Sequence, residues 1–376
     1  MYRSTRIVLF AAVTAAGVIA QAPPRVVAAG LQAPQKLALT AGGNFLVTEG
    51  GEKPNEGRVS IVTRAGARRS LIEGLPTGVS PEGEASGPTG IALRGRTLYV
   101  AIGVGDAEVD GPRPGSAVFS PKGPSSPLFS SVLVFELSGD ADAASAPFRM
   151  TPAQHMALAV GDEIELDNGA GANARASMLV NFVDAIPDPG AIYRFSNPWG
   201  IEVSADGNTL WVADASMDVV WRVDTRTGRP RMAGALPRQN NPTPVGGPII
   251  DSVPTAVHSC GGELLVSQLT GFPFLSNAAR IHALDTERRT FAPFIANLSL
   301  VTDFACTGSS ELFVLEMSGN FLAQPPAPGR LLRYSSPQPT VVSNAVILPV
   351  GLAYDEARRS VYVLELTGRL LEFALN

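Results

Sequence analysis

Cysteine and histidine are scarce in this sequence, and their scarcity excludes several kinds of site and fold. The 376 residues include two cysteines, Cys260 and Cys306, and three histidines, His155, His258 and His282. Zinc modules need clusters of such ligands at short spacing, and disulfide-framework domains need several cysteine pairs. The sequence therefore predicts neither class of protein. The histidines lack a companion at ligand or nucleophile spacing, so they identify no catalytic pair.

Charged residues are also few, at 17% of the chain, and they form no basic run. Lys and Arg number 29 against 34 Asp and Glu, which gives a net charge of −5. Nucleic-acid binding depends on concentrated positive charge, so no nucleic-acid partner is expected. Glycine and proline are abundant, with 38 and 31 residues. Frequent turn formers among short apolar segments indicate many short strands and argue against a coiled coil or a helical bundle.

One long apolar run is present, and it lies at the N-terminus. Arg3 and Arg6 precede an uncharged stretch, residues 7–20, which small residues and prolines follow. This layout is typical of a secretory signal peptide, predicted here over residues 1–22; the alternative is a mildly apolar, flexible terminus. A bilayer span needs about 20 apolar residues, more than this run or any later one supplies. The mature chain is therefore expected to be exported, periplasmic or extracellular, without a membrane span.

The rest of the sequence is built on a repeat. Each copy opens with a short apolar strand that begins at Pro-x-Gly or a related sequence, and a second strand rich in aromatic and aliphatic residues follows. From the opening residue to the valine of the second strand, the distance is 12 to 14 residues in every copy. Such a constant spacing is the signature of a repeat fold. The six opening strands are residues 34–39, 88–93, 198–203, 254–259, 301–306 and 349–354.

A third strand follows each second strand and often starts with Gly-Arg, and most copies show a weaker fourth strand. Six copies of four strands predict an all-β fold, a six-bladed β-propeller over residues 23–376. The sixth copy ends after three strands, whereas an extra strand, residues 25–28, precedes the first copy. We therefore expect the N-terminal strand to close the last blade beside residues 369–373, which would remove an exposed sheet edge.

One interval between copies is about twice the others. The opening residues are 47 to 56 residues apart, except that 110 residues separate the second copy from the third. Residues 138–196 lack the two-strand signature of a further blade. They are predicted to be a rim insertion after blade 2, with a short helix through Ala159 that Thr151 and Gln154 cap, and a hairpin around Asn168.

Loop lengths predict which face of the propeller binds other molecules. In antiparallel blades, the connections from second to third strand and from fourth to first strand lie on one face. Those connections are long and are expected to include the whole insertion, whereas turns on the opposite face are as short as residues 205–208. Ligands usually bind to the elaborated loops of a rigid scaffold. We therefore expect a small molecule or a protein to bind to this long-loop face.

Acidic residues recur two positions after the valine of the second strand, at the long-loop face. They are Glu49, Asp214, Glu316 and Glu365, and Gln268 takes the same position in a fifth copy. A ring of carboxylates could bind a divalent cation, the one cofactor that the sequence suggests. The alternative is structural: the acids cap turns or pair with arginines that open third strands, such as Arg330.

Aromatic and amide residues add further candidates. Phe272 and Phe274 either line an apolar pocket or cap the core, and Asn197 and Trp199 begin an inner strand near the axis. His258 alternates along an inner strand, which is the pattern of a core residue. No catalytic residue is predicted. The candidate residues of the ligand face are Asn197, Trp199, Asp214, Gln268, Phe272, Phe274, Asp303 and Glu316.

The two cysteines lie at equivalent ends of neighbouring inner strands. Cys260 is six residues, and Cys306 five residues, past the opening residue of its strand, on the short-turn face. Neighbouring inner strands approach each other near the axis, and an exported protein meets oxidising conditions, so we predict a disulfide. Two buried free thiols are the alternative.

Several segments resemble the ScyD/ScyE family of exported propellers, which is linked to scytonemin biosynthesis gene clusters, within the NHL-like six-bladed superfamily. They are residues 87–91, 196–200, 212–214, 269–274, 278–280 and 312–316, of which Leu-Thr-Gly-Phe-Pro-Phe at 269–274 is the most specific. This resemblance implies an exported six-bladed propeller but no particular reaction.

A second family, the senescence marker protein/gluconolactonase family, is similar in fold and uses a divalent metal near the axis. Two function hypotheses follow. The first is a non-catalytic binding or scaffold protein that uses the long-loop face. The second is a divalent-metal-dependent hydrolase or lactonase in which a metal polarises a carbonyl or activates water. Its candidate residues are Asn197, Asp214, Asp303 and Glu316.

Overall fold

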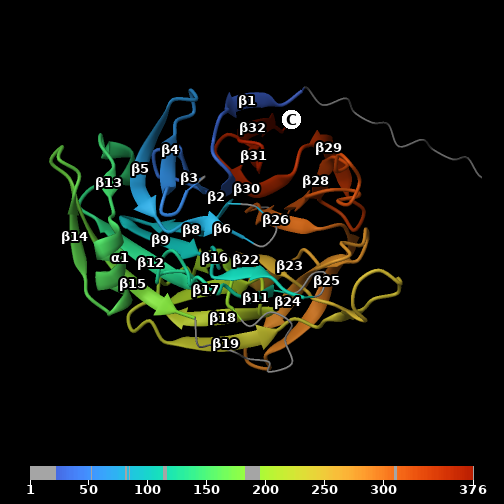
Figure 1. The fold of residues 1–376 in the computed structure, drawn as a ribbon. Helices are drawn as coiled ribbons and strands as arrows, with labels where there is room; N and C mark the ends of the chain where they lie inside the picture. Colours follow the sequence, from blue (N-terminus) through green and yellow to red (C-terminus); the bar gives the residue numbers. More distant parts are fainter. Residues whose placement is uncertain are drawn as a thin grey trace, which may run out of the picture.

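The computed structural model of the chain is a ring of six β-sheets around a central axis (Figure 1). It describes residues 23–375 except 52, 81–82, 84, 113–116, 183–194 and 309–310, so the predicted signal peptide lies outside the described residues. Each blade contains four antiparallel strands, and a fifth strand joins two of the six sheets. The first strand of each blade contacts the first strands of both neighbouring blades. The prediction of a six-bladed β-propeller is confirmed.

The strands of each blade follow one another along the chain, except that other elements interrupt blade 2 and that the N-terminal strand completes blade 6. Blade 1 contains β2 (Pro34–Leu39), β3 (Phe45–Glu49), β4 (Gly57–Val62) and β5 (Arg68–Leu75), and blade 2 contains β8 (Pro88–Arg94), β9 (Thr97–Ile102), β12 (Ser131–Leu137) and β15 (Asn173–Asn181). Blade 3 contains β16 (Pro198–Val203), β17 (Thr209–Asp214), β18 (Val219–Asp224) and β19 (Pro230–Ala235), and blade 4 contains β22 (Pro254–Cys260), β23 (Glu263–Gln268), β24 (Ala279–Asp285) and β25 (Thr290–Leu298). Blade 5 contains β26 (Val301–Cys306), β27 (Leu312–Glu316), β28 (Gly329–Tyr334) and β29 (Thr340–Val346), and blade 6 contains β30 (Pro349–Asp355), β31 (Ser360–Glu365), β32 (Arg369–Ala374) and β1 (Arg25–Ala28).

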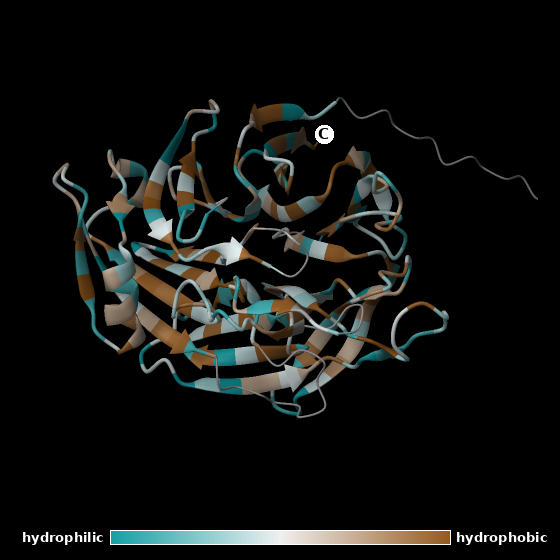
Figure 2. Ribbon diagram, viewed as in Figure 1, coloured by the Kyte–Doolittle hydropathy of each residue, from teal (hydrophilic) through white to brown (hydrophobic). Residues whose placement is uncertain are grey.

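The second strand of each blade is buried on both faces, which explains its unbroken apolar sequence. In β3, Leu46 packs between blades 1 and 2, whereas Phe45 and Val47 pack between blades 1 and 6. Successive side chains of a strand point to opposite faces, so one strand contributes to two interfaces. Among the described residues, the hydrophobic core accordingly divides into six clusters, one between each pair of neighbouring blades. Figure 2 shows the hydrophobic residues concentrated along the blade strands.

Crowding of the inner strands explains the Pro-Thr-Gly sequence that opens β8. The Thr89 hydroxyl donates to the carbonyl of the opening residue of blade 3, at 2.7 Å. Gly90 follows because a Cβ atom added there would lie 2.3 Å from the carbonyl oxygen of Trp199. Thr255 and Thr302 make the same hydroxyl-to-carbonyl bond to the next blade, at 2.7 Å and 3.0 Å. The repeat motif therefore encodes contacts to the next blade as well as contacts within its own blade.

The N-terminal strand closes the ring, as predicted. β1 pairs antiparallel with β32, with Arg25 opposite Glu372, and their side chains form an ion pair at 2.6 Å. Val27 and Ala28 are buried in the interface between blades 6 and 1, whereas Val26 is exposed. Figure 1 shows β1 in blue beside the red β32. The edge that β32 would otherwise expose is thereby paired.

The predicted rim segment is present, and it begins inside blade 2. Helix α1 (Pro152–Ala159) has the full capping box between Thr151 and Gln154, and β14 (Ile164–Asp167) forms a hairpin with β15. β15, however, pairs with β12 along its length, so it is the fourth strand of blade 2. The excursion leaves from the short-turn end of β12, and the expectation that it joins the long-loop face was wrong. Residues 138–172 separate the two paired strands, which hid their relation in the sequence.

The rim segment, residues 138–172, joins the outer parts of blades 1 and 2. Strand β13 (Phe148–Arg149) pairs in parallel with β5 of blade 1. Phe148, Met150 and Leu158 enter the cluster between blades 1 and 2. The segment therefore extends the packing of one blade interface at the rim. Its helix α1 has eight residues, and no helix in the described part of the chain is long and apolar enough to cross a bilayer.

Three of the long connections form two-stranded ribbons on the long-loop face. They are β6 (Gly78–Val79) with β7 (Ala85–Ser86), β10 (Glu108–Asp110) with β11 (Ala117–Phe119), and β20 (Gln239–Asn240) with β21 (Ile249–Ile250). Hydrogen bonds between the backbones of the paired strands order these three connections on the long-loop face.

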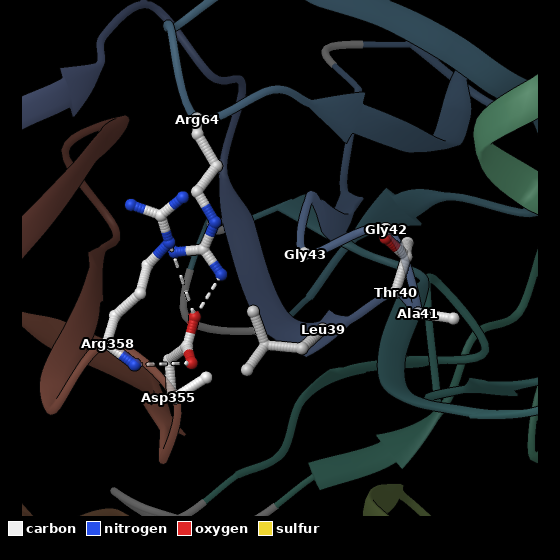
Figure 3. A pocket seen from close by; sticks show the side chains of 9 residues that line it. Leu39, Thr40, Ala41, Gly42, Gly43, Arg64, Asp355 and Arg358 are labelled. Carbon is white, nitrogen blue, oxygen red and sulfur yellow. Dashed lines mark hydrogen bonds and ion pairs between the residues drawn. The ribbon is translucent and has the colours of Figure 1, made fainter.

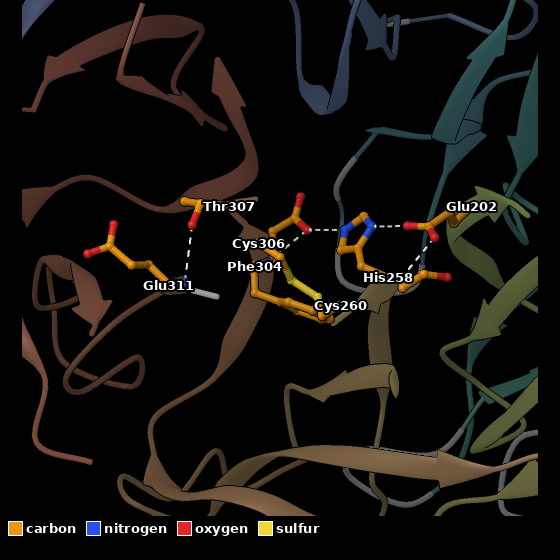
Figure 4. The surroundings of a disulfide bond; sticks show 9 residues. Glu202, His258, Cys260, Phe304, Cys306, Thr307 and Glu311 are labelled. Atoms are coloured by element: carbon orange, nitrogen blue, oxygen red, sulfur yellow. Dashed lines mark hydrogen bonds and ion pairs between the residues drawn. A yellow bond between two sulfur atoms is a disulfide. The ribbon is translucent and has the colours of Figure 1, made fainter. Parts of the chain in front are cut away.

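Cys260 and Cys306 form a disulfide, as the register of their strands predicted. Their Cα atoms are 5.8 Å apart, which is within the range that a disulfide spans. Cys260 ends β22 and Cys306 ends β26, so the bond joins blades 4 and 5 at the short-turn ends of their inner strands (Figure 4).

Because β1 closes the ring, we expect substitutions at two adjacent valines to change stability by different amounts. Val27→Asp should lower the free energy of unfolding by about 3 kcal/mol, because it places an uncompensated carboxylate in an apolar interface. Val26→Asp, at a position that is 51% exposed, is the matched control and should change stability by less than about 0.5 kcal/mol. Thermal and denaturant unfolding measure both.

Deleting residues 24–30 removes the closing strand. The deletion should cause aggregation or loss of cooperative unfolding, and an unchanged melting curve would contradict the closure.

The disulfide predicts a loss of stability when both cysteines become serine. Its sequence separation of 46 residues corresponds to a chain-entropy contribution of about 4 kcal/mol. Reduction of the unmodified chain should produce the same decrease in unfolding free energy as the double variant. Mass spectrometry of exported, unreduced protein under denaturing conditions checks the bond directly, and two alkylatable thiols would contradict it.

Candidate functional site

The carboxylates at the ends of the second strands are buried and bound within their own blades. Glu49, Glu316 and Glu365 each accept a backbone N–H from the segment that enters the blade, at 2.6 to 2.8 Å. Each also pairs with an arginine: Glu49 with Arg68, Glu316 with Arg330, and Glu365 with Arg369. These contacts anchor the entry loop of the blade to its second strand. They are the turn-capping and arginine contacts of the structural alternative.

Asp214 has the same place in blade 3 and is fully buried. It accepts hydrogen bonds from the Ser196 hydroxyl, the Asn197 and Met217 backbone N–H groups, and the Trp221 indole N–H, at 2.5 to 3.2 Å. Burial raises the pKa of Asp214, and these four donors oppose that rise. The aspartate therefore organises the loop around it.

The candidates for a metal site do not converge. Within the described residues, no three His, Cys, Asp or Glu side chains lie close enough to share an ion. Asn197 links blades 2 and 3, because its Oδ1 accepts the Val104 N–H at 3.1 Å. Gln268 is buried between the Ser252 hydroxyl at 3.3 Å and the His282 Nε2 at 3.1 Å. Both amides are thus engaged with groups of the protein.

Phe272 and Phe274 lie together, and a third phenylalanine joins them. Ring centroids are 5.9 Å apart for Phe272 and Phe274, and 5.1 Å apart for Phe274 and Phe321, both in edge-to-face geometry. Phe321 lies in the loop between β27 and β28, so the cluster connects long loops of blades 4 and 5. Such contacts contribute about 0.5–1.5 kcal/mol each. Phe321 lies outside every repeat motif, which is why sequence reasoning did not select it.

Exposed hydrophobic side chains are concentrated on the long-loop face. Thirteen large hydrophobic residues of the described chain are exposed, and eight of them lie in the connections of this face. They come from the three ribbons and from the loops that leave β27 and β29. These eight long-loop hydrophobic residues are Val79, Val109, Val118, Phe119, Val245, Ile249, Leu322 and Ile347.

A buried acid pair holds one of these ribbons in place. Asp218 accepts the backbone N–H groups of Ser252 and Val253 at 2.9 and 2.8 Å. Arg238 Nε lies 3.0 Å from Asp218 and 3.1 Å from Asp251. Burial, together with the charge of Asp251, raises the pKa of Asp218 to about 6. Since Arg238 and Asp251 flank β20 and β21, these contacts fix the base of that ribbon.

Four charged side chains from four inner strands lie close together near the axis, and we call them the axial charge chain: Glu202, His258, Asp303 and Lys36. Figure 4 shows Glu202 and His258 of this group. Glu202 of β16 lies 2.7 Å from His258 Nδ1, and Asp303 of β26 lies 3.3 Å from His258 Nε2. Lys36 Nζ lies 2.9 Å from the second oxygen of Asp303. The charges therefore alternate in sign from blade 3 through blades 4 and 5 to blade 1.

Burial differs along the axial charge chain. Lys36 and Asp303 are 7% and 5% exposed, whereas His258 and Glu202 are 31% and 24% exposed. Lys36 also donates to the carbonyl of Thr302 at 2.7 Å, and Asp303 accepts the N–H of Leu352 in blade 6 at 3.0 Å. The buried end of the chain thus connects three neighbouring blades.

The protonation of the axial charge chain follows from its geometry. Burial lowers the pKa of His258, but hydrogen bonds and charges of Asp303 and Glu202 outweigh it and raise the pKa to about 9. Burial likewise opposes ionisation of Asp303 and Glu202, but their partners hold both pKa values below the ordinary range. Burial also lowers the pKa of Lys36, which the charge of Asp303 counteracts. The two carboxylates therefore favour the protonated form of His258 at neutral pH.

Sequence reasoning selected only Asp303 from this group, although a signal was present. Lys36 and Asp303 both lie two residues after the opening residue of their strands, and Glu202 and His258 both lie four residues after it. Equivalent positions on inner strands have the same height along the axis, so aligning the repeat would have brought these charges together. Trp199, which was predicted, is half-buried one residue after the opening residue of β16.

Many solved structures are similar to this chain in fold, whereas the comparisons of its sequence give no match. No family model and no curated protein matches the chain. A structural-genomics protein of unknown function from Bacteroides thetaiotaomicron has a TM-score of 0.52 at 8% identity, covering 94% of this chain and 72% of that one. The PQQ-bound aldose sugar dehydrogenase of Streptomyces coelicolor has a TM-score of 0.51 at 15% identity, covering 93% and 96%. A putative 6-phosphogluconolactonase from Bacteroides uniformis has a TM-score of 0.46 at 15% identity, covering 92% and 86%. The likeness to the first two structures, at 8% and 15% identity, establishes the fold alone.

The axial charge chain predicts that stability falls as the pH rises above neutrality. The pKa of His258 is raised from 6.5 to about 9, so its protonated form stabilises the fold fully below pH 6.5, and this contribution is lost as the pH rises through 9. Denaturant unfolding between pH 6 and pH 10 should show the decrease, and His258→Gln should remove it.

The control for this experiment is His282→Gln, because burial lowers the pKa of His282 to about 4 and leaves it neutral over the same pH range. That variant should keep the pH dependence of the unmodified chain. An NMR titration of the His258 ring with a midpoint below pH 7 would contradict the assignment.

Proposed function

We propose that this chain is an exported binding or scaffold protein of the ScyD/ScyE type, which binds a small molecule or a protein through its long-loop face. The observation that carries the proposal is the concentration of the eight long-loop hydrophobic residues on one face. Exposed apolar residues that gather on one surface mark interaction sites more often than scattered ones do. The predicted signal peptide and the disulfide support export, because disulfides persist in oxidising compartments.

The long-loop face is also held in one arrangement, which favours binding. Strand pairing orders the three ribbons, Asp218 and Arg238 fix the base of one ribbon, and Phe274 packs against phenylalanines of two loops. A preorganised surface loses less conformational entropy on binding than a set of mobile loops.

The alternative, a metal-dependent hydrolase or lactonase, has less support from the contacts of its candidate residues. Asp214 and Glu316 are buried and accept several N–H donors, and Asp303 is engaged with Lys36 and His258. A catalytic metal needs several ligands at one point and an open coordination position. The neighbouring dehydrogenase and lactonase share the propeller fold with this chain, and fold does not determine reaction.

The proposal predicts that Phe119→Asp weakens binding of an apolar ligand to the long-loop face. Nile red serves as a neutral apolar reporter, and its affinity should fall by about fivefold or more, since a charge would stand in the contact surface. Phe294→Asp is the matched control: both phenylalanines are 52% exposed, but Phe294 lies on the outer strand β25. Fluorescence titration should therefore show the affinity of Phe294→Asp to be unchanged. Equal loss in both variants would contradict a specific face.

The enzymatic alternative is tested on the same preparation. Elemental analysis measures bound metal, and a panel of lactones and esters is assayed with and without a chelator. Under the binding proposal, the expected result is no chelator-sensitive turnover. Stoichiometric metal together with turnover that the chelator abolishes would replace the binding proposal by the hydrolase.

A further inference from the structure

A polar cleft lies on the short-turn face, opposite the long-loop face, at the seam that β1 closes. Its volume is about 270 Å³, and it lies between residues 40–43 of blade 1 and residues 355–358 of blade 6. Arg64, from the turn between β4 and β5, completes its lining. Figure 3 shows the side chains of Arg64 and Arg358 side by side above the carboxylate of Asp355.

Arg64 is held rigidly in this cleft. Its guanidinium donates to the Tyr362 hydroxyl and to the Asp355 carboxylate. The guanidinium carbon also lies 5.1 Å from the ring centroid of Phe45 and 5.0 Å from that of Tyr362, which are cation–π distances. The side chain is 17% exposed. An arginine fixed in this way presents its charge to a ligand without losing further rotamer freedom.

Arg358, in contrast to Arg64, is exposed to solvent and only loosely held. Its side chain is 61% exposed, and its Nε lies 4.0 Å from the Asp355 carboxylate. Asp355 already accepts from Arg64 and from the Arg358 backbone N–H at 3.1 Å. Two guanidinium groups therefore share one carboxylate among the residues that line the cleft, which leaves one positive charge uncompensated.

Two other acids lie near the turns that form the cleft, and both are engaged elsewhere. Glu356 accepts the backbone N–H of Gly308 at 3.2 Å. Asp142 accepts the backbone N–H of Gly42 at 3.2 Å and the Asn44 side-chain amide at 2.9 Å. Neither of them lines the cleft. The residues that face a ligand there thus carry a net positive charge, although the whole chain is acidic.

We propose that this cleft binds a small organic anion that carries a carboxylate or phosphate group. The planar guanidinium presents paired N–H donors that match both oxyanions, and such charge-assisted hydrogen bonds are among the stronger ones in proteins. The volume of the cleft accommodates a compact organic molecule and not only its charged group.

The position of the cleft couples ligand binding to closure of the ring. A bound anion contacts blade 1 through Arg64 and blade 6 through Arg358. Arg25 of β1 approaches the carbonyl of Arg64 at 3.4 Å, so the closing strand also contacts this site. A ligand that binds only the closed ring stabilises it, and the thermal midpoint should rise with ligand concentration.

The test titrates citrate and inorganic phosphate by isothermal calorimetry at constant ionic strength. The unmodified chain should bind citrate saturably, and Arg358→Gln should bind it about tenfold more weakly, because a charge-assisted contact is lost. Arg358→Lys should fall between the two, since lysine keeps the charge without the paired donors.

Arg288→Gln is the matched control. Arg288 also lies in a short turn, is 81% exposed and pairs with an aspartate three residues earlier, Asp285, but it does not line this cleft. The affinity of the Arg288→Gln variant for citrate should stay within about twofold of the affinity of the unmodified chain, because a distant exposed charge is screened by salt. Arg358→Gln should leave Nile red binding unchanged, which separates this site from the long-loop face.

Three results would overturn the proposal. The first is the absence of saturable binding of either anion to the unmodified chain. The second is unchanged citrate affinity in Arg358→Gln. The third is an equal loss in Arg288→Gln, which would mean that the anions respond only to overall charge. Citrate should also raise the thermal midpoint of the unmodified chain more than that of Arg358→Gln.

Discussion

Packing of one blade against the next is the interaction on which the rest of this structure depends. Every second strand is buried on both faces, with alternate side chains in two different interfaces, so no blade can satisfy its apolar surface alone. Six interfaces require that the last blade meet the first. The pairing of β1 with β32, and the burial of Val27 in that interface, complete the ring at the one place where the chain does not run continuously from blade to blade.

The axis carries a second set of contacts, which are polar. Thr89, Thr255 and Thr302 each reach the carbonyl that opens the following blade. The axial charge chain joins blades 3, 4 and 5 and links blade 5 with blade 1, which are not neighbours. The disulfide between Cys260 and Cys306 adds a covalent link on the same inner strands. The inner strands approach so closely at Gly90 that a side chain would not fit, and hydroxyls and paired charges occupy other positions near the axis.

The two faces of the ring differ in chemistry because their connections differ in length. Short turns on one face bring charged residues of neighbouring blades together, as at Arg64 and Asp355. Long connections on the other face form ribbons that present hydrophobic side chains. The buried carboxylates at the ends of the second strands position these long connections, so residues such as Glu316 support the long-loop face through contacts with the protein itself.

The repeat of Pro-x-Gly strands and aromatic-valine strands by itself determined the number of blades, the closing strand and the disulfide, and the capping box of Thr151 and Gln154 determined the short helix. These features follow from local patterns, from strand periodicity and from register along the chain. The fourth strand of blade 2 escaped detection because residues 138–172 intervene between β12 and its partner β15. Among the candidate residues, the sequence located Asp214 and Glu316 at their strand ends and Phe272 beside Phe274. Only the tertiary structure decided their partners, the axial placement of Lys36 beside Asp303, and the meeting of Arg64 with Arg358, because these contacts join strands and turns of different blades that only closure of the ring brings together.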